Sequence, residues 1–206
     1  QYGFANQIFI ALVIRVYRNG AVTEHGFRAG GRHHQIVFTV GGFYAIVMAM
    51  NGKFDLAAIG IFCAAVLDSL DGRVARMTNT QSAFGEQMDS LCDMVSFGVA
   101  PALVAYEWAL KGLGRWGWIA AFVYCACAAL RLARFNVTAK SDEPRDSAYF
   151  QGVPSPAGAL LVMLPMYLSF AIADRAVLPD TVICLYMIVV GLLLISRLPT
   201  WSFKTT

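Results

Sequence analysis

The chain has 206 residues, which is enough for one domain of ordinary size. Hydrophobic residues make up 58% of it and charged residues only 14%, against roughly 25% charged in soluble globular proteins, so the composition excludes an ordinary soluble domain. The net charge of +3 is too small to indicate a nucleic-acid partner.

The first part of the chain, residues 1–34, is more polar than the rest and forms a separate N-terminal segment in our prediction. A short apolar stretch from Ile8 to Ile14 is followed by arginines. This pattern favours an amphipathic helix that lies on a membrane surface, in a cytoplasmic or interfacial position, over a cleavable signal peptide.

Residues 35–206 contain apolar runs long enough to cross a bilayer. The longest, Pro154 to Ala173, has 20 residues without a charge, and about 20 helical residues span the hydrocarbon core. We therefore predict an all-α polytopic membrane protein with six transmembrane helices. The predicted spans are 35–51, 54–77, 82–110, 115–135, 154–174 and 177–196.

The distribution of basic residues predicts the orientation of these spans. If the N-terminus is cytoplasmic, twelve of the 16 lysines and arginines lie on the cytoplasmic side, as the positive-inside bias requires. The turn between the second and third spans then faces the cytoplasm. We expect an integral protein of a bacterial-type inner or cell membrane.

That turn carries an unusual set of carboxylates. Asp68 and Asp71 are three residues apart and Asp89 and Asp93 are four apart, so each pair shares one face of a helix. The first pair ends one predicted helix and the second pair begins the next. An antiparallel hairpin would therefore bring all four carboxylates together near the membrane boundary.

Four clustered carboxylates repel one another and call for a counter-charge. Hard divalent cations choose oxygen ligands, and two such ions about 3.5–4 Å apart can clamp a phosphoryl centre. Gly72 and Gly85 let a ligand approach the backbone, and Arg76 can bind phosphate. A polar hairpin with an ion pair such as Asp71 to Arg76 is the structural alternative.

At this point the sequence resembles the CDP-alcohol phosphatidyltransferase family, whose signature is D-x-x-D-G-x-x-A-R, eight residues, then G-x-x-x-D-x-x-x-D. Every fixed position is present in this chain. The resemblance implies a homodimer with a cytoplasm-facing site and Mg²⁺ or Mn²⁺, two ions, as cofactor. It implies metal ligands Asp68, Asp71, Asp89 and Asp93, with Asp93 also the general base. It implies that Gly72, Ala75, Arg76 and Gly85 bind the CDP-lipid.

Flanking segments are similar to the phosphatidylserine synthase branch of the family, including 93–98, 130–136, 150–156 and 202–204. This implies transfer of a phosphatidyl group from CDP-diacylglycerol to L-serine, with release of CMP. Candidate acceptor contacts are Arg131, Arg134, Asn136 and Ser155, and positive-inside anchoring is the other interpretation of the two arginines. The resemblance fails before residue 42, where the stretch 32–39 lacks the expected Pro-Asn motif.

Three alternatives stay open at the level of the sequence. The acceptor could instead be glycerol phosphate, inositol or inositol phosphate, or choline. An ion or proton transporter also places carboxylates in membrane helices, although the fourth, fifth and sixth spans lack them at their centres. An inactive scaffold of the same fold is disfavoured, because all four aspartates are intact.

Overall fold

The computed structural model describes residues 39–78, 83–139, 149–151, 153–172, 178–196 and 199–201. Side chains are described for residues 39–68, 87–137, 153–172 and 178–196. The predicted amphipathic helix within residues 1–34 lies outside the described residues.

Helices occupy each of the six ranges predicted from the sequence, within the part of the chain that is described. In chain order they are Thr39–Met50, α3 (Phe54–Thr78), α4 (Ala83–Asp93), α5 (Ala100–Ala105), α6 (Arg115–Ala139), α7 (Ser155–Ile172) and α8 (Asp180–Ile195). The third range is one helical rod in which α4 and α5 are joined by a π-helical turn, η1 (Met94–Val99). After α5 it continues through a second π-helical turn, η2 (Tyr106–Leu110), and a 3₁₀ turn, η3 (Lys111–Leu113).

Three of these helical stretches are long and apolar enough to cross a membrane: Gln87–Leu113, Arg115–Val137 and Ser155–Ile172. The helices Thr39–Met50 and Asp180–Ile195 are apolar but shorter. The all-helical membrane class predicted from composition is therefore confirmed. Of the six predicted spans, three are long and apolar enough in the described part of the chain to cross a membrane.

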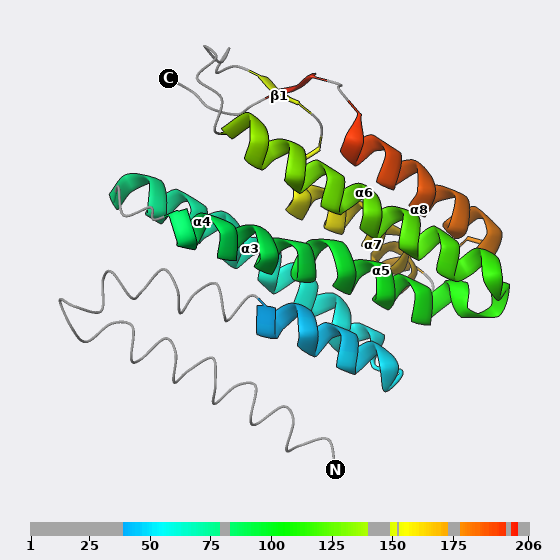
Figure 1. Cartoon of the computed structure of the whole chain (residues 1–206). Helices are drawn as coiled ribbons and strands as arrows, with labels where there is room; N and C mark the ends of the chain where they lie inside the picture. Colours follow the sequence, from blue (N-terminus) through cyan, green and yellow to red (C-terminus); the bar gives the residue numbers. More distant parts are fainter. Residues whose placement is uncertain are drawn as a thin grey trace.

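The helices pack side by side in one bundle, with α6 along α8 and α3 along α7 (Figure 1). Small residues allow the helix Thr39–Met50 to approach α3 closely. A Cβ atom added at Gly60 would lie 3.5 Å from the Cβ of Ala45 and 3.6 Å from the Gly41 carbonyl oxygen. Small-residue contacts of this kind are typical of helix pairs in membranes.

Two buried prolines interrupt the backbone hydrogen bonding of membrane helices, and a tyrosine from a neighbouring helix compensates at each. Pro165 in α7 has no N–H to donate to the Leu161 carbonyl, and the Tyr186 hydroxyl of α8 donates to that oxygen at 2.8 Å. Pro101 leaves the Phe97 carbonyl in the same situation, and the Tyr124 hydroxyl of α6 donates to it at 3.1 Å. These bonds satisfy backbone carbonyls that cannot hydrogen-bond to water inside a bilayer.

The described residues also contain one small departure from an all-helical fold. Strand β1 (Tyr149–Gln151) pairs antiparallel with β2 (Pro199–Trp201), with Phe150 opposite Thr200. In Figure 1 the pair lies beyond the end of α6, where α7 begins. It joins the segment before α7 to the segment after α8.

We predict that Tyr186→Phe lowers the free energy of unfolding by about 1 kcal/mol, because the Leu161 carbonyl loses its donor. In a Pro165→Ala background the restored peptide N–H can serve that carbonyl, so the same Tyr186→Phe change should cost clearly less. Thermal unfolding of the purified protein in detergent measures all four members of the cycle. Tyr106→Phe is the control, since its hydroxyl makes no hydrogen bond to the described residues. Equal costs in both backgrounds would contradict the compensation.

Candidate active site

The predicted acidic hairpin is present as two consecutive helices. Asp68 and Asp71 lie in the C-terminal half of α3, and Asp89 and Asp93 lie in α4. By backbone position Gly72, Ala75 and Arg76 also belong to α3, and Gly85 to α4. The side chains of residues 69–86 are not described, so the roles assigned to that part of the motif stay predictions.

Asp93 lies at the centre of the charges that the structure describes. Its carboxylate, half-buried at the end of α4, interacts electrostatically with the carboxylates of Asp68 and Asp89 and with the guanidinium of Arg131. α3, α4 and α6 thus each direct a charged group toward one region. Among the side chains that are described there, one cation stands against three carboxylates.

Arg131 connects this region with the start of α7. Its guanidinium donates a hydrogen bond to the hydroxyl of Ser155, the first residue of α7. Ser155 is buried, with only 4% of its surface exposed. The same guanidinium faces Asp93. Asp93, Arg131 and Ser155, all site residues predicted from the sequence, are therefore brought together.

The other two candidate acceptor contacts make different interactions. The guanidinium of Arg134 donates to the carbonyl of Ile195 at 2.7 Å, at the C-terminal end of α8. This is a favourable place for a cation because helix C-termini carry unpaired carbonyls. The amide nitrogen of Asn136 lies 2.9 Å from the hydroxyl oxygen of Ser90 on α4.

Sequence reasoning did not identify the π-helical turn that follows Asp93. In η1 the N–H of Ala100 bonds to the carbonyl of Val95, five residues back, and Ser96, Phe97 and Gly98 are buried. The helix Thr39–Met50 touches this turn directly, since a Cβ at Gly42 would lie 2.8 Å from the Ser96 Cα. In the sequence, Pro101 was the residue that could have indicated irregular backbone here. Nothing in the sequence around Ser90 indicated its contact with Asn136.

The donor set fits a hard divalent cation in its chemistry: carboxylate oxygens in excess of basic partners at one helix hairpin. Among the side chains that are described, no three acidic, histidine or cysteine residues gather closely enough to hold a metal ion. Asp71 is not part of that set. The four-carboxylate metal site therefore stays a prediction.

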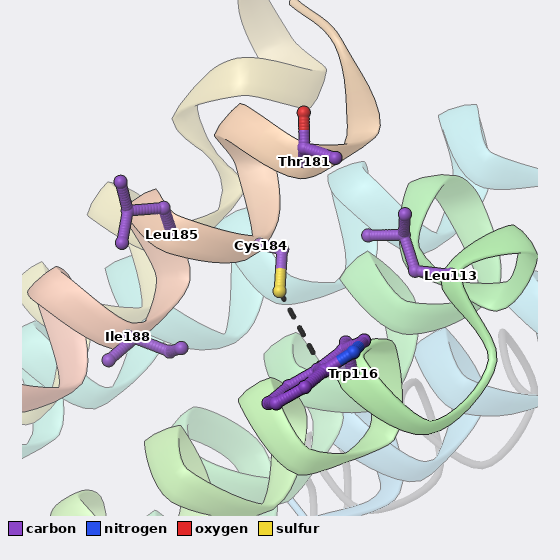
Figure 2. Close-up of a pocket in the computed structure, with 6 residues that line it drawn as sticks. All are labelled: Leu113, Trp116, Thr181, Cys184, Leu185 and Ile188. Atoms are coloured by element: carbon purple, nitrogen blue, oxygen red, sulfur yellow. Dashed lines mark hydrogen bonds between the residues drawn. The ribbon is translucent and has the colours of Figure 1, made fainter.

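Two surface hollows formed by described residues lie apart from this region. One, of about 230 Å³, is lined mainly by apolar residues of η3, α6 and α8, together with Thr181. In this hollow the Cys184 thiol donates to the Trp116 carbonyl at 3.7 Å (Figure 2). The other lies between α3 and α7 beside Asp55. Neither hollow contains a residue of the predicted site.

Taken together, the helical bundle and its acidic hairpin define a membrane-embedded protein with a charged centre at one end of apolar helices. The model of the CDP-alcohol phosphatidyltransferase family matches residues 35–195, and the chain belongs to this family. The predicted resemblance is thereby confirmed.

Curated relatives carry a more specific name. The chain is 36% identical over 163 residues to a CDP-diacylglycerol–serine O-phosphatidyltransferase of Helicobacter pylori, covering 79% of this chain and 68% of that protein. It is 40% identical over 168 residues to the protein of that name from Mycobacterium leprae, covering 80% and 55%. It is 41% identical over 134 residues to the one from Saccharomyces cerevisiae, covering 59% and 48%.

We predict that Arg131→Met destabilises the protein in the presence of a chelator by about 2 kcal/mol, because Asp93 then faces two carboxylates without its cation. Adding Asp93→Asn should recover part of that loss. Arg134→Met is the matched control, since its exposed guanidinium caps α8 and makes no contact with the carboxylates among the described interactions. The measurement is thermal unfolding in detergent. No recovery in the double variant would contradict the pairing of Asp93 with Arg131.

Proposed function

We propose that this protein transfers the phosphatidyl group of CDP-diacylglycerol to L-serine, forming phosphatidylserine and CMP. The observation that carries the proposal is the convergence of Asp93, Arg131 and Ser155 beside the acidic hairpin of a CDP-alcohol phosphatidyltransferase fold. The printed names of the curated relatives support serine as the acceptor.

In the proposed reaction the serine hydroxyl attacks the phosphorus that bears the diacylglycerol. A new P–O bond forms to serine, and the bond from that phosphorus to the CMP phosphate oxygen breaks. Asp93 accepts the hydroxyl proton, and CMP leaves as an anion. Because a carboxylate is a weak base for an alcohol, proton transfer and attack are expected to be concerted.

Arg131 and Ser155 are the acceptor contacts that we favour. The guanidinium bonds to the Ser155 hydroxyl and interacts electrostatically with Asp93, so it could receive the carboxylate of serine while the hydroxyl of serine approaches Asp93. Arg134 and Asn136 stay weaker candidates, since their hydrogen-bond partners, the Ile195 carbonyl and Ser90, lie outside the group formed by Asp93, Arg131 and Ser155.

The remaining roles follow the family signature. Asp68, Asp71, Asp89 and Asp93 would hold Mg²⁺ or Mn²⁺, in our proposal two ions. Bound there, the cations would neutralise the diphosphate and polarise the phosphorus. The CDP-lipid would contact Gly72, Ala75, Arg76 and Gly85.

The proposed topology has six spans, with the acidic hairpin at the cytoplasmic face. The six helical ranges and the excess of lysine and arginine on that side support it. The signature also implies a homodimer, which chemical crosslinking in native membranes would test.

The acceptor is tested by incubating the purified protein with CDP-diacylglycerol and, separately, serine, glycerol phosphate, inositol, inositol phosphate or choline. Serine alone should yield a phospholipid product, and a chelator should abolish it until Mg²⁺ or Mn²⁺ is restored. Product with another acceptor but not with serine would overturn the serine assignment. Full activity in metal-free buffer would overturn the metal assignment.

We further predict that Asp93→Asn lowers turnover by at least about 10²-fold, the lower range of general acid–base contributions, and retains binding of the CDP-lipid. The two readouts are CMP release and retention of labelled CDP-diacylglycerol on the immobilised protein. Gln87→Asn, on the exposed side of α4, serves as the control. Unchanged CMP release would remove Asp93 from the mechanism.

A further inference from the structure

The rod formed by α4, η1 and α5 runs past the helix α6 in the opposite direction, with contacts along its length. Ser90 meets Asn136, Asp93 faces Arg131, and Gly98 packs on Ala128, where an added Cβ would lie 3.4 Å from the Ala128 Cβ. As the position along α4 and η1 rises from 90 to 98, its partner on α6 falls from 136 to 128. These contacts define one antiparallel register.

The π-helical turn divides this register into two parts. In η1 the backbone hydrogen bonds span five residues instead of four. The directions of the side chains on α4 therefore do not follow from those on α5 by the regular α-helical repeat. Within η1 itself the register is fixed by Gly98 against Ala128 and by the Tyr124 hydroxyl on the Phe97 carbonyl. The α4 side, which bears Asp89 and Asp93, needs a contact of its own.

Ser90 and Asn136 supply that contact. The Asn136 amide nitrogen is 2.9 Å, and its amide oxygen 3.1 Å, from the Ser90 hydroxyl oxygen, and both residues are half-buried. Ser90 lies one turn from Asp93, on the far side of Asp93 from η1, and Asn136 lies beyond Arg131 in the last turns of α6. A polar pair between packed helices is a known way to specify their register.

We infer that Ser90 and Asn136 are positioning residues that hold the register of α4 against α6 and so keep Asp93 opposite Arg131. This inference rests on the proposed function for its activity readout and on the proposed metal site for its Mn²⁺ readout. Without the pair, α4 would lose its side-chain hydrogen bonds to α6 and would rotate or shift more easily at the π-helical turn. The acidic ligands of α4 would then leave the carboxylate of Asp68 and the guanidinium of Arg131.

The test compares Ser90→Ala, Asn136→Ala and the double variant with the exchanged pair Ser90→Asn/Asn136→Ser, which restores a hydroxyl and an amide on opposite helices. Each alanine variant should lower kcat by about three- to twentyfold, the span expected for one interhelical hydrogen bond, and change KM for serine little. The double variant should match the single ones, and the exchanged pair should recover most of the loss. Gln87→Ala, an exposed polar residue one turn earlier on α4, should behave as wild type.

A second readout does not need turnover: Mn²⁺ binding to the purified protein, followed by electron paramagnetic resonance. The alanine variants should bind Mn²⁺ several-fold more weakly, whereas Gln87→Ala should not. Additive losses in the double variant, no recovery by the exchanged pair, or unchanged Mn²⁺ binding would overturn the positioning role. Failure of wild-type protein to use serine, with the Mn²⁺ pattern intact, would overturn the proposed function and leave this inference standing.

Discussion

The antiparallel contact between the α4–α5 rod and α6 is the feature on which both the fold and the site depend. Inside a bilayer a charge or a backbone carbonyl has to find its partner within the protein. Along this contact the Phe97 carbonyl accepts a hydrogen bond from the Tyr124 hydroxyl, and the Asp93 carboxylate lies within the electrostatic influence of Arg131. The contact with α6 therefore buries the irregular backbone of η1, and the charged groups of the proposed site lie next to it along the same contact.

Most of the helical framework could be predicted from the sequence, because its signals are local. Length and apolar composition located the six helical ranges, and the carboxylate spacing predicted two helices, α3 and α4, that each carry one acidic pair. The family resemblance, carried by Asp68 to Asp93, was confirmed by the family match. The N-terminal segment, the oligomeric state and the metal ligands remain predictions.

The parts that could not be predicted depend on contacts between residues far apart in the chain. Nothing near Ser90 or Asn136 indicates that they meet, since 46 positions separate them. The donors that serve the carbonyls near Pro101 and Pro165 come from α6 and α8, and the strand pair joins segments on either side of two helices. Arg134 illustrates the same limit, because its partner, the carbonyl of Ile195, lies 61 positions away.

The pairing of β1 with β2 has a consequence for biosynthesis. Residues 149–151 leave the ribosome before α7 and α8, and their partner strand follows about 50 residues later. Ser155, whose hydroxyl accepts a hydrogen bond from Arg131, lies four residues after the end of β1. The strand pair beside the start of α7 can therefore form only after the segment that follows α8 has been synthesised.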